Sequence, residues 1–365
     1  MPRDPVLKGP EPGEGPPEET PVAAGSESGF DPDDGRLDEQ LRPMTLDDVV
    51  GQSKVVERLR IVLEAARLRG DPLSHLLLDG PPGIGKTTLA TVLPRELGVD
   101  VQITSGPSLS APKDLLPYLT NAGRGSVLFI DEIHRLPPTV EEFIYPAMED
   151  FRIDITLGEG LNARTINMPL EPFTVIGATT RSGMLTAPLR DRFGIPVRLQ
   201  FYTVEELELV VRRAARLLDL AITSDGAIEI ARRSRGTPRI AKRLFRRARD
   251  YAQVKGNGQI DVSSAMKSLE ILKVDAVGLQ EADIKLLEAI IDKFNGGPVG
   301  VNNLAAVIGE EEETITEVYE PYLLKEGFLK RTPKGRQAMP RAYEHLGREA
   351  PISSETGADD QISLL

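Results

Sequence analysis

The sequence predicts an α/β core with a parallel sheet and a phosphate-binding loop, followed by a small all-helical lid domain and a C-terminal winged-helix domain. Three observations lead to this prediction. A G-x-x-x-x-G-K-T pattern spans residues 80–87, between an apolar run and a run of helical character. The lid has apolar positions at helical spacing, and the last domain has three helical segments before a basic hairpin. The predicted boundaries are a tail at 1–36, the core at 37–202, the lid at 203–273, the winged helix at 276–347 and a tail at 348–365.

The composition excludes several kinds of chemistry. The chain of 365 residues contains no cysteine and three scattered histidines, so disulfides, thiolate catalysis and cysteine- or histidine-rich metal sites are not expected. There is no run of about 18 apolar residues that would span a membrane, and the N-terminus lacks the apolar segment of a secretory signal. We therefore expect a cytoplasmic protein with no membrane partner.

Acidic residues are concentrated in the two tails. The net charge is −12, of which residues 1–36 carry −6 and residues 348–365 carry −3. The first tail also holds eight Pro and six Gly, and such a segment buries too little apolar surface to offset its ordering entropy. We expect both tails to be disordered. The remaining charge of −3 is spread over 311 residues, so it does not argue against nucleic-acid binding.

The loop at 80–87 has the chemistry of a phosphate site. Glycines allow backbone N–H groups to turn toward phosphate oxygens, and the following helix N-terminus adds a positive partial charge. Lys86 can reach the β- and γ-phosphates, and the Thr87 hydroxyl can hold Mg²⁺. The alternative is a glycine-rich turn that binds nothing. The apolar strand in front and the Lys-Thr pair favour a nucleoside triphosphate site.

Apolar runs alternate with helical segments around this loop. Thr45 and Asp48 form a helix-start pattern, and residues 53–68 and 89–97 have helical periodicity. Strands are expected at 76–78, 101–104, 127–130, 173–178 and 197–201. This alternation behind a phosphate loop predicts a parallel sheet.

Polar side chains follow the carboxyl ends of these strands, where ligands bind in open α/β sheets. Asp131 suits an Mg²⁺ shell, and Glu132 can orient or deprotonate the attacking water, although a solvated acidic pair is the alternative. Thr180 follows a later strand, where its hydroxyl could contact the γ-phosphate or the water. Arg190 and Arg192 form local salt bridges, or one of them is an arginine finger that stabilises charge in phosphoryl transfer.

Residues 151–170 have the pattern of a β-hairpin. Ile153, Ile155 and Leu157 alternate with polar residues, a Gly-Glu-Gly turn follows, and a second alternating run ends at Met168. The isoleucine face could contact another protein or pack on its own domain, and the residues leave both possibilities open.

Helical periodicity returns after residue 202. Lid helices are expected at 203–220, 225–233, 238–254 and 261–272. Thr203 and Glu206 form a capping box at the start of the first helix. Residues 231–249 hold nine Lys or Arg and no acidic residue, which is usually a solvated basic face. Arg239 differs, because Pro238 suits the first turn of a helix and sets this arginine beside it.

The winged-helix prediction includes a forecast about charge. Helices are expected at 281–294, 302–308 and 314–325. The third helix is preceded by the acidic run Glu310 to Glu313, which suits the helix dipole but repels phosphates. The wing carries the basic residues Lys330, Arg331, Lys334 and Arg336. We therefore expect the wing to contact DNA, mainly at phosphates and without base reading. The alternative is a winged helix used for protein contact, with a solvated wing.

Together, the motifs resemble a known family. GPPGIGKTT at 80–88, LFIDEIHR at 128–135, GATTR at 177–181, PLRDRFG at 188–194 and RGTPR at 235–239 resemble the AAA+ ATPases. LRP at 41–43, YPAMED at 145–150 and GFLKRTPKGR at 327–336 are similar to the RuvB family, the motors of Holliday-junction branch migration. The resemblance covers residues 37–347 and neither tail.

The resemblance implies roles for individual residues. ATP would be held by Leu41, Arg42, Gly83, Gly85, Lys86, Thr87, Thr88, Glu149, Asp150, Phe151, Tyr202 and Arg239, with Thr87 also on Mg²⁺. Asp131 and Glu132 resemble the Walker B pair, Thr180 the sensor-1 residue, and Arg239 sensor 2. Arg192 resembles the finger that reaches a neighbouring subunit's nucleotide. Arg331 and Arg336 match the family's DNA-contacting positions.

The resemblance also implies partners. These are a homohexameric ring around duplex DNA at four-way junctions, a RuvA-type protein docked on the hairpin at 151–170, and a RuvC-type resolvase. The all-acidic run at 310–313 departs from some relatives, and the N-terminal tail is outside the family pattern. Two rival functions are a clamp-loader-like switch and a protein-remodelling unfoldase. The unfoldase needs an aromatic pore loop, which the sequence does not convincingly contain, and the basic wing speaks against it.

Overall fold

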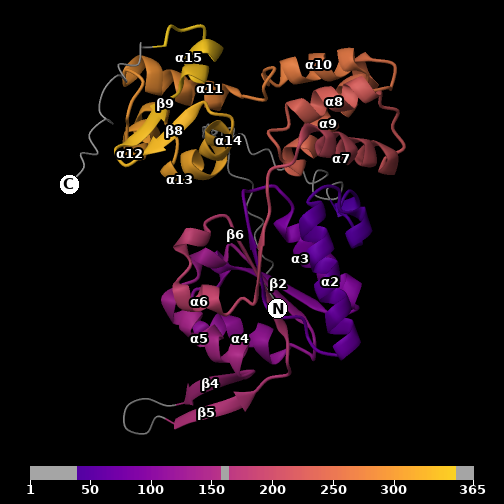
Figure 1. The fold of residues 1–365 in the computed structure, drawn as a ribbon, viewed down its shortest axis with the longest axis vertical. Coiled ribbons are helices and arrows are strands. Elements are labelled where there is room, and N and C mark those ends of the chain that lie inside the picture. The colour runs from indigo at the N-terminus through magenta and orange to yellow at the C-terminus, as the bar shows by residue number, and fades with distance from the viewer. Residues whose placement is uncertain (1–38, 158–163, 351–365) are drawn as a thin grey trace, which may run out of the picture. The chain divides into compact units, whose positions relative to one another are not determined.

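Five parallel strands form the central sheet of the computed structural model, which describes residues 39–157 and 164–350 (Figure 1). In sheet order they are β2 (Val101–Ser105), β3 (Val127–Asp131), β6 (Thr174–Thr179), β1 (Leu76–Asp79) and β7 (Ile195–Arg198). Every neighbouring pair is parallel, which confirms the predicted α/β core. Because β3, β6 and β1 are adjacent, the residues that follow them meet at one edge of the sheet.

Two details of the sheet region differ from prediction. The strand expected at 197–201 ends at Arg198, although the N–H of Leu199 still donates to the Asp79 carbonyl at 2.8 Å. Thr45 and Asp48 do form a capping box, but it starts only the three-residue 3₁₀ turn η1. The predicted tail at 1–36, most of the tail at 348–365 and the hairpin turn at 158–163 lie outside the described residues.

Helices cover both faces of the sheet, with α2 and α3 on one side and α4, α5 and α6 on the other (Figure 1). The helical elements of this domain are η1 (Leu46–Asp48), α2 (Ser53–Arg69), α3 (Lys86–Leu97), η2 (Gly106–Ser108), α4 (Pro112–Thr120), η3 (Ile133–Arg135), α5 (Pro138–Glu149), η5 (Ser182–Met184) and α6 (Ala187–Asp191). Strand residues Leu128, Ile130 and Val175 form one buried cluster with Leu115 of α4 and Ile144 of α5. This packing fixes the sheet edge that carries the polar residues.

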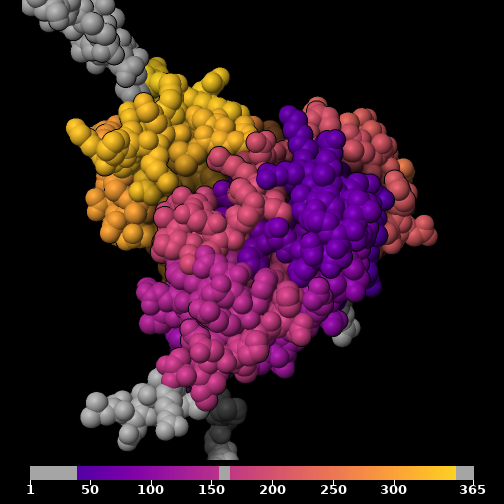
Figure 2. Space-filling view, turned by 60° about the horizontal axis from the view of Figure 1, so that its bottom comes forward, coloured from indigo at the N-terminus to yellow at the C-terminus, as the bar shows by residue number. Residues whose placement is uncertain are grey.

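The predicted hairpin consists of the antiparallel strands β4 (Arg152–Leu157) and β5 (Arg164–Pro169), which project from the domain (Figure 1). Ile153 is fully buried, and its cross-strand partner Met168 packs partly against the domain core. Ile155 also packs there, whereas its partner Ile166 is 50% exposed. Figure 2 brings this end of the molecule forward and shows the hairpin at the surface. The base of the apolar face therefore packs on its own domain, and Ile166 on the same face remains accessible.

The lid forms the four helices expected of it. They are α7 (Val204–Leu217), α8 (Ser224–Arg232), α9 (Pro238–Lys255) and α10 (Val262–Ile271). The Thr203 hydroxyl accepts from the N–H of Glu206, and the Glu206 carboxylate accepts from the N–H of Thr203, as the capping box predicts. The Thr237 hydroxyl caps α9 by accepting from the N–H of Ile240, and Pro238 is the first residue of the helix, so Arg239 lies in its first turn.

The C-terminal domain is a winged helix. Its elements are α11 (Glu281–Glu288), the π-helical segment η6 (Ala289–Lys293), α12 (Val301–Ile308), α13 (Glu312–Thr314), the π-helical segment η7 (Ile315–Tyr319), α14 (Glu320–Lys325), β8 (Leu329–Thr332), β9 (Gly335–Ala338) and α15 (Pro340–His345). The third helix thus starts two residues earlier than predicted and contains a π segment just before Pro321, which has no N–H for a regular helical bond. Within the described residues, every helix is too short or too polar to cross a lipid bilayer.

Candidate nucleotide site and basic wing

The loop between β1 and α3 has a backbone that only glycine adopts easily. Gly80, Gly83 and Gly85 have φ values of 152°, 78° and 102°. A Cβ on Gly80 would lie 2.5 Å from the Ile84 side chain, and one on Gly83 would lie 3.0 Å from Arg239 Cβ. The tight loop therefore brings its backbone to the first turn of α3, where unpaired N–H groups favour an anion.

Lys86 lies over this loop. Its side chain is nearly buried, and its Nζ donates to the carbonyls of Gly80 at 2.7 Å and Pro81 at 2.9 Å. Burial lowers the pKa of Lys86 to about 8, against the opposing attraction of Asp131. An ammonium that has lost this much solvation gains strongly from a phosphate placed beside it.

Thr87 and Asp131 form a pair of oxygen donors next to Lys86. The Thr87 hydroxyl lies 3.5 Å from Asp131 Oδ2, at the carboxyl end of β3. No group of three or more acidic or histidine side chains in the described part of the chain could hold a metal alone. One hydroxyl and one carboxylate nevertheless fit Mg²⁺, which usually takes one or two carboxylates and completes its shell with substrate phosphates and water.

Glu132 and Thr180 complete the sheet edge. Glu132 has the uncommon φ of 47°, a conformation that costs energy and is often retained at functional sites. Its carboxylate lies 3.3 Å from Arg135 and is 40% exposed. The Thr180 hydroxyl is buried and has no hydrogen-bond partner among the residues that the structure describes. A buried hydroxyl without a partner is costly, and a phosphate oxygen or an ordered water would satisfy it.

An apolar pocket lies beside the phosphate loop, between that loop, the N-terminal segment and the lid. Its lining is largely apolar and comprises Leu41, Pro43, Asp48, Val49, Val50, Gln52, Ile84, Gly85, Thr88, Leu89, Tyr202, Val210, Arg213, Ala214, Pro238 and Lys242. Such a pocket suits a purine base beside the phosphate loop. Burial raises the pKa of Tyr202, so its hydroxyl stays neutral. Arg42, predicted to line this side, is exposed and is absent from the described lining.

Several pocket residues escaped prediction. Arg213 and Lys242, from two lid helices, both donate to the Leu41 carbonyl, at 3.1 and 3.3 Å. Val49 and Val50 were visible as an apolar pair, but nothing local linked Arg213 to a site 172 residues earlier. Arg239 lies in the first turn of α9, as Pro238 predicts, and its N–H donates to the Gly83 carbonyl at 3.2 Å.

Four predicted site residues gather elsewhere in the domain. Arg192 forms an ion pair with Glu149 at 3.1 Å, and its guanidinium lies 3.9 Å over the Tyr145 ring. Asp150 and Phe151 follow Glu149 directly at the end of α5. Within the described chain none of the four lines the apolar pocket or the polar cavity beside Gly80, Pro81 and Thr180. The buried Nε of Arg192 has no described hydrogen-bond partner.

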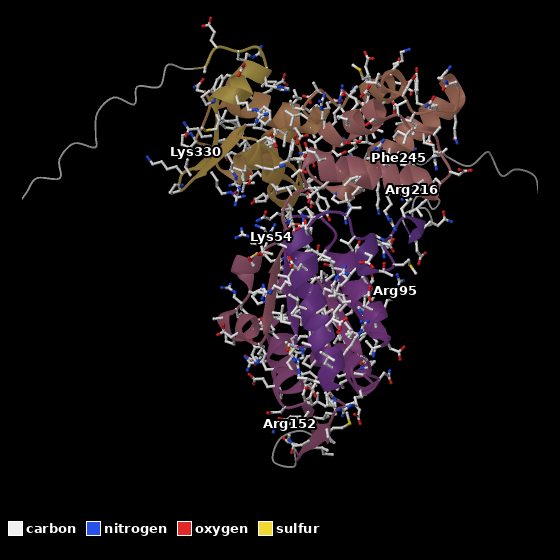
Figure 3. All side chains as sticks on the ribbon, turned by 45° about the vertical axis from the view of Figure 1, so that its right-hand side comes forward. Lys54, Arg95, Arg152, Arg216, Phe245 and Lys330 are labelled. Atoms are coloured by element: carbon white, nitrogen blue, oxygen red, sulfur yellow. The ribbon has the colours of Figure 1, made fainter. Side chains whose placement is uncertain are left out.

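The wing carries exposed cations, and Glu313, the last residue of the acidic run, lies close to arginines of the core domain. Lys330 and Lys334 are exposed, and Figure 3 shows Lys330 pointing away from its domain. Arg331 is 51% exposed, whereas Arg336, expected to contact DNA, is only 14% exposed and pairs with buried Glu320. Glu313 and Glu317 lie 3.9 and 2.7 Å from Arg181, so the start of the third helix pairs with the protein's own cations.

Comparisons with known proteins match all three folded domains to one family. Residues 41–199 match the RuvB P-loop domain of the Holliday junction DNA helicase, residues 202–275 the RuvB AAA lid domain, and residues 276–347 the RuvB C-terminal winged-helix domain. The chain is 56% identical over 319 residues to the Holliday junction branch migration complex subunit RuvB of Flavobacterium psychrophilum, covering 87% of this chain and 94% of that protein.

Solved structures give the same result. The RuvB Holliday junction branch migration motor of Thermotoga maritima is 50% identical, with a TM-score of 0.79 over 86% of this chain and 100% of that one. A point mutant of the same Thermotoga protein is 51% identical, with a TM-score of 0.80 over 85% and 99% of the two chains. The fold, the order of the three domains and the phosphate loop all agree, and this chain belongs to the RuvB family of P-loop AAA+ ATPases.

Proposed function

We propose that this chain is an ATP-driven motor that moves the branch point of Holliday junctions, working as a hexameric ring around duplex DNA. The observation that carries the proposal is the sheet edge at which Lys86 and Asp131 lie close to the Thr180 hydroxyl, which has no hydrogen-bond partner among the described residues, while lid residue Arg239 contacts the same phosphate loop. The same chain carries a basic wing suited to phosphates. The site is thus built for a triphosphate and the wing for a nucleic acid.

Each residue of this edge has a role in the proposed hydrolysis. Lys86 binds the β- and γ-phosphates, and Thr180 donates its free hydroxyl to the γ-phosphate or the attacking water. Glu132 orients and deprotonates that water. Mg²⁺, held by Thr87 and Asp131, would neutralise negative charge on the phosphates. The apolar pocket under the lid takes the adenine.

The second group of residues completes the site of a neighbouring subunit. Arg192 lies apart from its own chain's pocket, together with Glu149, Asp150 and Phe151. A guanidinium supplied across an interface stabilises the charge of the transition state and can raise the rate by about 10³–10⁵. Hydrolysis would then require a ring. This requirement is the reason that we propose a hexamer rather than isolated subunits.

Partners follow from the same proposal. Ile166 on the β4–β5 hairpin offers an accessible apolar contact for a RuvA-type junction-binding protein. A RuvC-type resolvase would act on the junction that the motor moves. Because its substrate is chromosomal DNA, we place the protein in the cytoplasm.

Strand exchange is the direct test. The full chain would be incubated with ATP, Mg²⁺, a RuvA-type partner and a synthetic four-way junction, and dissociation into two duplexes would be followed on a gel. We expect movement that needs ATP and is lost in Lys86→Ala. ATP turnover without junction movement would instead favour a clamp-loader-like switch. Turnover indifferent to DNA but stimulated by an unfolded protein would favour an unfoldase.

A further inference from the structure

A buried carboxylate lies beneath the wing. Glu320, the first residue of α14, has a side chain only 1% exposed. Arg331 of β8 and Arg336 of β9 stand directly opposite each other in the wing ladder. Both guanidiniums donate to Glu320: Arg331 through Nη2, and Arg336 through Nε and, at 3.3 Å, through Nη2. Two cations side by side on a hairpin repel each other, and the shared carboxylate removes that repulsion.

The two arginines are held differently. Arg336 is 14% exposed and gives two of its three nitrogens to Glu320 in a side-on fork. Arg331 is 51% exposed and gives one nitrogen, so its other two have no described partner. Because the guanidinium is planar, a hydrogen bond at one nitrogen restricts the directions of its remaining donors, although less than a two-bond fork does. Only Arg331 therefore combines an anchored plane with donors facing solvent.

We propose that Glu320 is a positioning residue for DNA binding. Together with Arg336 it forms a buried anchor that holds Arg331 in the orientation in which its free nitrogens meet a backbone phosphate. Arg331 makes the contact, whereas Arg336 acts through the anchor and does not touch DNA itself. This inference rests on the proposed function, because it presumes that the wing binds duplex.

The direction in which Glu320→Gln changes DNA affinity distinguishes a positioning role from an effect of net charge. Glu320→Gln removes one negative charge from beneath the wing. If the wing attracted DNA by net charge alone, this variant would bind more tightly, since electrostatic attraction of this kind follows total charge. If Glu320 positions Arg331, the variant loses the ordered phosphate contact and binds more weakly. Glu320→Gln is the central variant because Gln has nearly the same size as Glu and the two explanations predict opposite changes in DNA affinity.

The experiment is a titration of the full-length chain against a labelled duplex of mixed sequence, read by fluorescence anisotropy, over a range of KCl concentrations. Each phosphate contact contributes about 0.9 to the steepness of the plot of log affinity against log salt concentration. When the salt concentration rises fourfold, a variant that has lost one contact should therefore lose about 3.5-fold less affinity than the unaltered chain. We expect Arg331→Ala to show this loss. Glu320→Gln should weaken binding and flatten the slope in the same direction.

Double variants supply the control. Glu320→Gln should add nothing in an Arg331→Ala background, because the group that it positions is already gone. It should still weaken binding in a Lys334→Ala background, because Lys334 is exposed and does not contact Glu320. If Glu320→Gln does not fold, Arg336→Ala takes its place in the same single and double variants. It disturbs the anchor but leaves Glu320 paired with Arg331, so no buried charge is left unpaired.

Three results would overturn the inference. Tighter binding by Glu320→Gln would leave only a net-charge effect. An equal loss in the Arg331→Ala background would mean that Glu320 merely maintains the wing's fold. A slope reduced by about 0.9 in Arg336→Ala, additive with Arg331→Ala, would make Arg336 a contact in its own right. If the unaltered chain does not bind duplex at all, the proposed function fails first, and the role of Glu320 fails with it.

Discussion

The depressed pKa of Lys86 predicts that nucleotide affinity depends on pH. With a pKa of about 8, the ammonium form falls from about 90% at pH 7 to about 10% at pH 9. A bound triphosphate stabilises the ammonium and raises the pKa of Lys86. At a pH between the pKa of the free protein and that of the complex, binding therefore takes up a proton. Affinity is therefore highest below pH 8 and falls as pH rises above it, by about tenfold between pH 7 and 9, or about 1.4 kcal/mol.

The assay is the dissociation constant of a fluorescent ATP analogue at several pH values, with the proton uptake measured by calorimetry in two buffers. Lys86→Arg is the matched control, because a guanidinium remains charged throughout this range and any ionisation of the nucleotide affects both proteins equally. Burial lowers the pKa of the nearby His134 below its ordinary value, so that imidazole stays neutral and does not contribute above pH 7. A flat profile in the unaltered chain, or an equal slope in Lys86→Arg, would refute the reasoning.

Three further predictions concern other parts of the molecule. Arg192→Ala should bind ATP normally but lose turnover by about 10³-fold or more, and mixing it with Lys86→Ala subunits should restore some activity; mixtures that stay inactive would exclude a finger acting between subunits. Thr180→Val should leave ATP affinity nearly unchanged and lower kcat by about 10²-fold, whereas an unchanged kcat would show that the partnerless hydroxyl is not used. Arg235→Ala breaks a buried two-bond pair with Asp283 and should lower the unfolding free energy by about 3–5 kcal/mol in a denaturant titration, a change that Arg69→Ala in the exposed Arg69–Asp71 pair should not match.

Local patterns predicted the parts of the fold that local physics determines. The phosphate loop, the capping boxes and the lid helices each depend on residues within a few positions of one another, and the structure has them where expected. Helices α4 and α5 were not predicted, and each has a proline inside it, Pro117 and Pro146, as the predicted helix α3 has Pro94. Their apolar faces pack in the core cluster, and that burial outweighs the lost backbone bonds.

Roles that depend on distant partners were harder to predict. Arg213 lines the apolar pocket only because a lid helix returns to Leu41, and the periodicity of that helix gives no sign of this contact. The resemblance drew attention to Arg192 and Glu149, but their shared position away from the pocket is visible only in three dimensions. The polar ends of strands, by contrast, were predictable, because parallel strands bring them to a common edge.

The wing shows that the number of basic residues in a segment does not reveal how each of them is held in the fold. In the sequence, Lys330, Arg331, Lys334 and Arg336 form one basic group, and each seems equally suited to a phosphate. The fold divides them, because strand pairing turns both arginines toward α14 while the two lysines remain exposed. Glu320 appears in the sequence as one more acid in a helix, ordinarily solvated. Only its burial reveals that it must be paired, since an ionised carboxylate without a partner is too costly to keep inside a protein. That requirement, rather than the number of positive charges, decides which wing arginine is held close to α14 and which keeps half of its side chain exposed.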